Sequence, residues 1–186
     1  MPTILTHVAV PVAATVALGW RRIPGEALLA GMVAAVAPDA DGIAFKLGMA
    51  YGGLAGHRGF THTLLFALLL GLAGYALAPR WHMRRWAGYA WIALCTLSHP
   101  LLDMMTNAGA GIVLLWPLDS AHHFFAWRPI EASPISPRRF LSWRGVQVLR
   151  NEAALVWAPL MATALLVWAA RHGLVRSARL NPRNGS

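Results

Sequence analysis

The sequence is poor in charge and in cysteine. Only 12% of its 186 residues are charged and 57% are hydrophobic, whereas soluble domains carry about 25% charged residues. This shortage predicts an integral membrane protein made of one compact domain. The single cysteine, Cys95, lies in an apolar stretch, which excludes a disulfide framework and a cysteine-based zinc motif. Any metal must therefore be held by histidines and carboxylates.

Other patterns are also missing. The motif H-E-x-x-H does not occur, which argues against an intramembrane zinc protease. The net charge of +9 does not gather into a basic patch with stacking aromatics. Arginines instead stand at the ends of apolar segments beside tryptophans such as Trp20, Trp86 and Trp143, as at a membrane interface. We therefore expect no nucleic-acid partner. The N-terminal MPTILTH lacks the features of a cleavable signal peptide, so His7 is expected in the mature chain.

Five apolar segments fall at about 3–20, 26–37, 63–79, 86–106 and 147–170. They predict an all-α integral membrane bundle of about five apolar helices. The second segment is shorter than the roughly 20 residues that span a bilayer, so it is expected to be short or re-entrant. Pro159 predicts a kink in the fifth helix. The predicted organisation is a single membrane-embedded domain over 1–172, with an extramembrane loop at 107–146 and a basic, disordered tail at 173–186.

Alternating helix directions would sort the connecting segments onto two membrane sides. One side carries nine arginines, at positions 21, 22, 80, 84, 85, 171, 176, 179 and 183, with Glu26 as its one acid. The other carries seven basic residues, including Lys46 and Arg58, and nearly all the acids. The positive-inside rule places the arginine-rich side in the cytoplasm.

The ionisable residues of the apolar segments gather on the other side. Such groups are costly near a bilayer, so each is a candidate for function. Strict alternation puts all of them at one membrane face: His7, Asp39 and Asp41 in PDAD, His57 and His62 in GHRGFTHT, His99 and Asp103 in SHPLLD, and Glu152. The sequence therefore predicts a polar metal site at that face.

Local spacings support metal ligation. His99 and Asp103 are four residues apart, so a helix stacks them on one face. Imidazole nitrogen with carboxylate oxygen suits zinc, manganese or iron. If PDAD is extended, Asp39 and Asp41 point the same way and could bridge two cations. Arg58 is suited to clamp a phosphate.

Plainer interpretations compete with these. The four remaining histidines are expected to be solvated at the interface: His82, His122, His123 and His172. SHPLLD could be a polar kink whose groups bond to neighbouring helices, and PDAD could simply end a helix in a turn. Thr61 or Thr63 is expected to cap the helix that follows.

The order of His7, PDAD, GHRGFTHT and SHPLLDMMTNAG followed by LLWPL resembles the YdjM-like family. Its members are LexA-regulated bacterial inner-membrane proteins regarded as metal-dependent hydrolases, distantly similar to zinc-dependent phospholipase C. The resemblance covers roughly residues 1–120 and extends to 150–160. It implies an inner-membrane protein, and the positive-inside assignment above then makes it multi-pass with its site facing the periplasm.

The phospholipase pattern implies ligand positions. Its early histidine matches His7, its first aspartate Asp39 or Asp41, its next histidine His57 or His62, and its His-x-x-x-Asp pair His99 and Asp103. The later His-x-x-x-Glu is incomplete, because Val148 stands four residues before Glu152. His122 and His123 could substitute from the loop. Two metal ions are thus better matched than three.

The resemblance implies hydrolysis of a lipid-linked or membrane-proximal phosphoester. Whichever of Asp39 and Asp41 is not a ligand would be the general base, and Arg58 would stabilise the phosphate oxygens. The rival hypothesis is a non-enzymatic metal-binding membrane protein or transporter, although a transporter would favour midplane sites and internal symmetry. An ester or carbon–nitrogen hydrolase with the same cluster stays open.

Overall fold

A computed structural model describes residues 1–42, 54, 56–134 and 136–180, with side chains described through residue 173. Over these residues the fold is helical and holds two isolated β-bridges in place of strands. This confirms the predicted all-α bundle. Its elements are α1 (Ile4–Leu18), α2 (Gly25–Val36), η1 (Ala37–Asp41), η2 (Phe60–His62), α4 (Leu64–Leu77), η3 (Ala78–Trp81), α5 (Arg85–Met104), α6 (Pro137–Phe140), α7 (Trp143–Glu152), η4 (Ala153–Trp157) and α8 (Ala158–Leu180).

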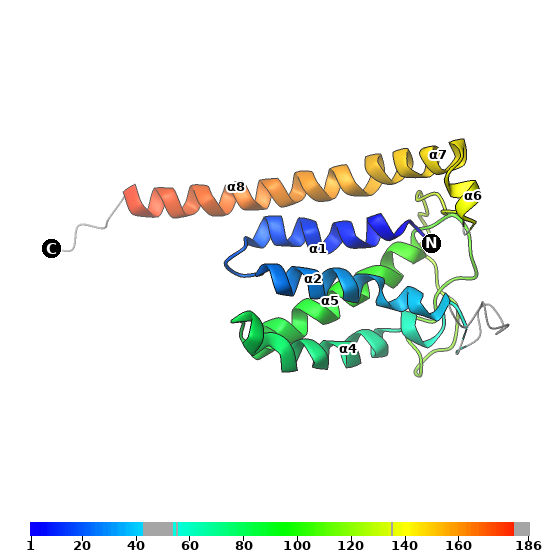
Figure 1. The fold of residues 1–186 in the computed structure, drawn as a ribbon, viewed down its shortest axis with the longest axis horizontal. Helices are drawn as coiled ribbons and strands as arrows, with labels where there is room; N and C mark the ends of the chain where they lie inside the picture. The colour runs from blue at the N-terminus through cyan, green and yellow to red at the C-terminus, as the bar shows by residue number, and fades with distance from the viewer. Residues whose placement is uncertain (43–53, 55, 135, 181–186) are drawn as a thin grey trace.

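The five long helices lie side by side in the order α8, α1, α2, α5 and α4 (Figure 1). The connections α1–α2 and α4–α5 lie at the same end of the bundle, and α8 runs on past that end (Figure 1). The chain's N-terminus, η1, η2 and α7 meet at the other end (Figure 1). The helices thus alternate in direction, and the segments that carry the predicted ligands share one end.

Small residues bring the helices close together. A Cβ added at Gly74 of α4 would lie 2.3 Å from the backbone oxygen of Gly88 in α5. A Cβ added at Gly31 of α2 would lie 2.7 Å from the indole nitrogen of Trp91. That nitrogen donates a 2.7 Å hydrogen bond to the Ala27 carbonyl. Small side chains at helix contacts are typical of membrane bundles, in which helix association depends on close packing.

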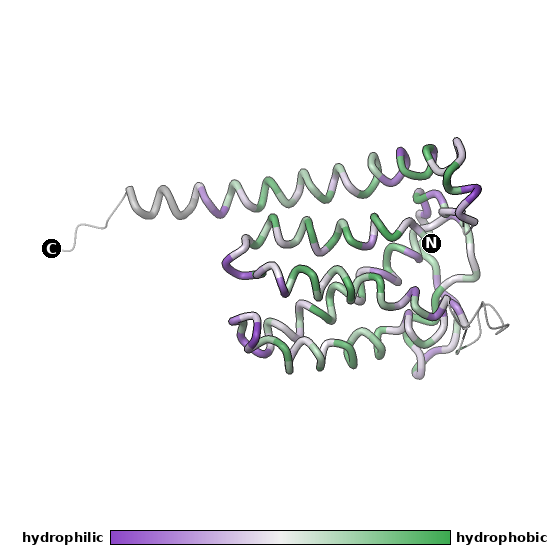
Figure 2. The backbone as a smooth tube through the Cα atoms, in the orientation of Figure 1, coloured by the Kyte–Doolittle hydropathy of each residue, from purple (hydrophilic) through white to green (hydrophobic). Residues whose placement is uncertain are grey.

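Apolar residues run along the helices, whereas hydrophilic residues gather at the turns and loops (Figure 2). Two of the described helices are long and apolar enough to span a membrane, Leu64–Trp81 and Trp143–Gly173, and the apolar α1 is shorter. The second segment forms a helix of only 12 residues, as its length predicts.

The fifth helix departs from its predicted limits. It starts at Trp143 instead of residue 147, within the stretch assigned to the extramembrane loop. Near the predicted kink it has the π-helical turn η4, which ends two residues before Pro159. Pro159 has no N–H to donate to the carbonyl four residues back, so a regular α-helical ladder cannot continue through it.

The helix also continues to Leu180, into the tail for which disorder was predicted. Residues 174–180 are mostly Leu, Val, Arg and Ala and include no proline, a composition that a helix accommodates. Lys46 and residues 181–186 lie outside the described residues.

Candidate metal centre

Four parts of the chain meet at the N-terminal end of α1. His7 comes from the first turn of α1, and Asp39 and Asp41 come from η1. The segment 57–62 leads into α4 through η2, and His99 and Asp103 lie in the last turns of α5. Asp39 and Asp41 are partly buried, and the other ionisable side chains of these parts are buried: His7, His57, Arg58, His62, His99 and Asp103. The structure therefore brings together polar side chains that are up to 96 positions apart in the chain, from His7 to Asp103.

The first ligand group consists of His7, His99 and Asp103. One ligand atom from each lies within 4.8 Å of the others, and His7 Nε2 is 3.7 Å from Asp103 Oδ1. The two imidazoles are stacked, with ring centroids 3.7 Å apart. His99 Nδ1 lies 2.8 Å from the Ala35 carbonyl oxygen. Because a carbonyl only accepts, Nδ1 carries the proton and Nε2 offers a lone pair to a metal.

The second ligand group consists of Asp39, His57 and His62, again with one ligand atom from each within 4.8 Å of the others. Asp39 Oδ1 lies 4.0 Å from His62 Nε2 and 3.4 Å from His99 Nε2. Asp103 Oδ2 lies 3.9 Å from His62 Nε2. The carboxylates of Asp39 and Asp103 thus each face histidines of both groups, and the two groups form one continuous centre.

Asp41 has a different environment from Asp39. Its carboxylate lies 2.6 Å from His57 Nδ1 and 3.1 Å from His62 Nδ1. It also accepts hydrogen bonds from the Thr61 hydroxyl at 2.6 Å and from the Arg58 backbone at 3.1 Å. A carboxylate bound to Nδ1 fixes the orientation of a metal-ligating histidine. Asp41 therefore orients both histidines, whereas Asp39 belongs to the ligand group.

The expectation that Asp39 and Asp41 point the same way is wrong. It assumed an extended PDAD, but residues 37–41 form a 3₁₀ helix. With three residues per turn, side chains two positions apart point in different directions. Asp39 accordingly faces His99, and Asp41 faces His57 and Thr61.

The centre contains buried polar atoms without hydrogen-bond partners among the described residues. Leaving such an atom unsatisfied costs about 1–3 kcal/mol, so native proteins keep them few. Nearly all of those found here are atoms of this centre: both ring nitrogens of His7, both oxygens of Asp39 and Asp103, Nε2 of His62 and His99, and Nε and one terminal nitrogen of Arg58. Neutral imidazole and carboxylate together form a donor set for divalent cations. The residues present thus fit a metal centre.

The pKa shifts of Asp41 and His62 favour protonation states that are compatible with metal binding. Burial opposes ionisation of Asp41, but hydrogen bonds from His57 and His62 outweigh it and hold the pKa of Asp41 below its usual range. Burial likewise lowers the pKa of His62, although Asp41 partly offsets it. The imidazole of His62 is therefore neutral near pH 7, the state in which it can ligate a metal.

Arg58 is fully buried and has the left-handed backbone angle φ 71°. One terminal nitrogen lies 3.3 Å from Asp103 Oδ2 and the other donates to the Ala108 carbonyl at 3.4 Å. Gly109 lies directly over the guanidinium, since a Cβ there would be 2.0 Å from Arg58 Nη1. The guanidinium of Arg58 thus lies against the carboxylate of Asp103, which faces histidines of both ligand groups.

Glu152 lies outside both ligand groups. Its carboxylate accepts hydrogen bonds from the Thr3 backbone at 2.6 Å, from the Thr3 hydroxyl and from the Thr6 hydroxyl at 2.7 Å. Trp157 in η4 donates to the same Thr6 hydroxyl at 2.6 Å. Glu152 thereby fastens the start of α1, and so His7, to the end of α7.

The remaining predicted positions lie elsewhere. His123 pairs with Asp119 at 2.9 Å in a part-exposed loop, and neither His122 nor His123 joins a ligand group of the described residues. Thr63 caps α4 by accepting from the Phe66 backbone at 3.0 Å. Sequence reasoning missed the contacts of Thr61 with Asp41 and of Ala35 with His99. For the first contact the sequence offered one signal, the Thr61 hydroxyl within GHRGFTHT. For the second it offered none, because the Ala35 group is a backbone carbonyl.

Fold and centre together define a helical membrane protein with a buried histidine–aspartate centre at one end of its bundle. The YdjM inner membrane protein family matches residues 1–174, and this chain belongs to that family. It is also similar to the inner membrane protein YbcI of Escherichia coli (strain K12), with 39% identity over 172 residues that cover 90% of this chain and 98% of YbcI. No solved structure matches the chain. The predicted family and inner-membrane location are thus confirmed.

Proposed function

We propose that this protein is a membrane-bound metal-dependent hydrolase, most consistent with a phosphoesterase that acts on a lipid-linked or membrane-proximal substrate. The observation that carries the proposal is a set of buried imidazole and carboxylate atoms that have no hydrogen-bond partner among the described residues and lie within the two ligand groups. They belong to His7, Asp39, His62, His99 and Asp103. We assign His7, His99 and Asp103 to one cation and Asp39, His57 and His62 to a second. The donors suit zinc, with manganese or iron as alternatives.

In this proposal a pair of divalent cations would supply a water that ionises near neutral pH and positive charge for a phosphate. Asp41 acts as a positioning residue, because it holds His57 and His62 through their Nδ1 atoms. Asp39 is assigned as a ligand and the oxygens of Asp41 are already hydrogen-bonded, so neither aspartate is assigned here as the general base that the resemblance implied. Arg58 is the donor to the phosphate oxygens, after exchange of its contact with Asp103.

The proposed topology is multi-pass with the centre toward the periplasm. Its support is the alternation of helix directions, which puts the arginine-rich turns at the end of the bundle opposite the metal centre (Figure 1). The positive-inside rule then assigns those turns to the cytoplasm.

A second candidate function is a structural or regulatory metal site without catalysis. The observation in its favour is burial: His7, His99 and Asp103 are completely inaccessible to solvent. A structural site is closed, whereas a catalytic one keeps an open position for water or substrate. Both functions predict bound metal, and only the first predicts turnover.

The experiment is an assay of purified protein, loaded with zinc or manganese, against phosphomonoesters and phosphodiesters. Product release by the wild type, abolished in Asp103→Ala, is expected. Retained metal without turnover on any of these substrates would favour the structural site. Asp119→Ala is the matched control, because Asp119 is an aspartate paired with a histidine outside the centre.

A further inference from the structure

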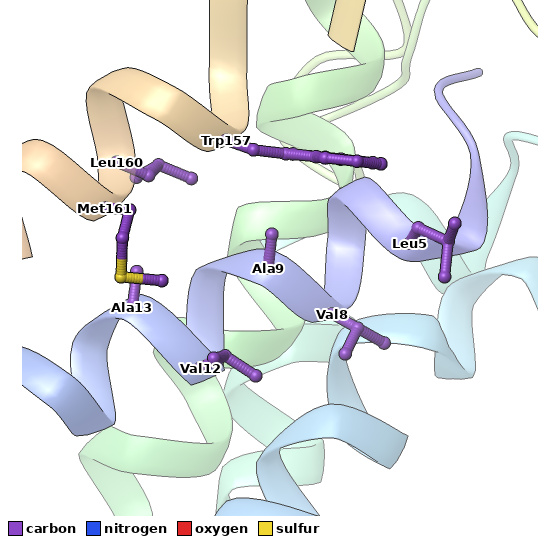
Figure 3. A pocket seen from close by; sticks show the side chains of 8 residues that line it. All are labelled: Leu5, Val8, Ala9, Val12, Ala13, Trp157, Leu160 and Met161. Atoms are coloured by element: carbon purple, nitrogen blue, oxygen red, sulfur yellow. The ribbon is translucent and has the colours of Figure 1, made fainter. Parts of the chain in front are cut away.

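Two grooves flank the contact between α1 and α8. The first is lined by α1 residues around Ala9 and by Trp157, Leu160 and Met161, whose side chains lie over α1 (Figure 3). The second lies on the other side of the same contact and encloses about 440 Å³. Of the two, the second groove alone has a described lining residue from α5, Leu102. The two grooves therefore differ in their relation to the metal centre.

The second groove begins beside the metal centre. Leu102 in the last turn of α5 and Met105, the residue just after α5, line it, one residue before and two residues after the ligand Asp103. On α1, Val10 and Ala14 line it and follow His7 by three and seven residues, which places all three on one helix face. A molecule in this groove thus lies along the same helix faces that carry two of the ligands.

The groove ends near the opposite end of α1. Ala17 and Val167 line its last part, and Arg171 donates a 2.5 Å hydrogen bond to the Ala17 carbonyl just beyond. From Val10 to Ala17 the helix rises roughly 10 Å, at about 1.5 Å per residue. This is about a third of the hydrocarbon thickness of a bilayer.

The groove lining identifies the chemistry of its occupant. Among the described residues that line it, Thr163 alone has a polar side chain, and the rest are Val, Leu, Met, Pro and Ala. One wall belongs to Trp143–Gly173, a candidate membrane span whose side chains are mostly exposed. In a bilayer such a surface contacts hydrocarbon, and the small side chains Ala14, Ala17 and Ala164 leave room for a chain to pack.

We propose that the second groove binds one acyl chain of a membrane phospholipid whose phosphate lies at the metal centre. This inference rests on the proposed function, because it names the apolar part of the substrate on which that centre would act. The groove holds the chain along α1 and α5, so that the phosphoester is presented next to Asp103 and Arg58. A second copy of this chain seated in the groove is the competing occupant.

Photolabelling in a membrane tests the proposal. The full-length protein is reconstituted in vesicles of equal parts phosphatidylethanolamine and phosphatidylglycerol, with a trace of phosphatidylglycerol carrying a diazirine in one acyl chain. After irradiation, labelled peptides are located by mass spectrometry. We expect labelling concentrated on residues 10–17, 102–105 and 155–167. Labelling spread evenly over all outward faces, or cross-links between two chains through these segments, would overturn the proposal.

Two neighbouring variants sharpen the test. Thr163→Trp fills the groove and should lose most of the labelling, whereas Ala162→Trp, exposed on the same helix but outside both grooves, should keep it. Thr163→Leu narrows the groove less and should give an intermediate loss, which guards against misfolding of the larger variant. Equal labelling in all three would contradict the assignment.

Hydrolysis of p-nitrophenyl phosphate by the wild type separates this inference from the proposed function. Groove-specific labelling without hydrolysis of this soluble ester or of any phospholipid would reject the phosphoesterase and leave the lipid site standing. Hydrolysis with unspecific labelling would reject the lipid site alone. If both hold, Thr163→Trp should lower phospholipid hydrolysis relative to p-nitrophenyl phosphate hydrolysis.

Discussion

Asp41 Oδ1 lies 2.6 Å from Nδ1 of His57, and the other oxygen of the same carboxylate lies 3.1 Å from Nδ1 of His62. One carboxylate thus sets the orientation of two candidate ligands. Asp39, two positions earlier, has no such partners and faces His99 and His62 instead. The two aspartates of PDAD therefore have different tasks, which mutation can separate.

Asp39→Ala should remove a metal ligand. Asp41→Ala should leave the ligands in place and remove only the carboxylate that orients His57 and His62. We expect Asp39→Ala to lose about one metal equivalent per chain, because the second ligand group loses its carboxylate. Asp41→Ala should keep the stoichiometry and lose about 10–100-fold in metal affinity, as is common for outer-shell partners. Elemental analysis and competition with a chelator measure the two quantities. Identical behaviour of the two variants would contradict the assignment.

Gly109→Ala should displace Arg58. The added Cβ would lie 2.0 Å from Nη1 of Arg58, and the φ of +107° is unfavourable for any residue with a Cβ. We expect a destabilisation of about 1–3 kcal/mol from the backbone conformation alone. Any phosphoesterase activity should fall further, because Arg58 loses its position beside Asp103.

Gly25→Ala is the control for this variant, since its Cβ would meet nothing within 4 Å. It should leave the stability of the protein and its activity close to those of the wild type. Comparable losses in the two glycine variants would argue against a special contact between Gly109 and Arg58. Thermal unfolding and phosphoester turnover give the comparison.

Glu152→Ala should loosen the start of α1 without removing a metal ion. The change leaves the Thr3 N–H and the Thr3 and Thr6 hydroxyls without their buried acceptor, at a cost of about 1–3 kcal/mol for each unsatisfied group. Hydrogen exchange over residues 3–10 should accelerate, and metal content should persist. Loss of a full metal equivalent would instead identify Glu152 as a ligand.

Glu131→Ala provides the matched control for Glu152. Glu131 forms an ion pair with Arg144 whose side chains are 31% and 45% exposed, and surface pairs contribute about 0–1 kcal/mol. In Glu131→Ala the rates of hydrogen exchange over residues 3–10 should equal those of the wild type.

The gathering of the ligands at one end of the bundle could be predicted because it depends on few features. Five apolar segments that alternate in direction bring His7, His99 and His62 to the same end, whatever the details of packing. The pairing of His99 with Asp103 likewise follows from helical periodicity alone. Both features survive errors of several residues in the helix limits, such as the early start of the fifth helix at Trp143.

The division of tasks within the centre could not be predicted. The roles of Asp39 and Asp41 depend on whether PDAD is extended or 3₁₀, and the sequence permits both. The task of Glu152 depends on Thr3 and Thr6, which lie about 150 positions away in the chain. The support of His99 by the Ala35 carbonyl involves a backbone atom, which no sequence motif marks.

The metal content of the purified protein tests the central claim most directly. The protein is extracted in mild detergent, loaded with zinc or manganese, freed of loose metal by gel filtration and measured by elemental analysis. The two ligand groups predict about two tightly held ions per chain, reduced to about one in His99→Ala and unchanged in His172→Ala. A wild type without bound metal, or with the same metal content as a variant lacking both Asp39 and Asp103, would contradict the claim.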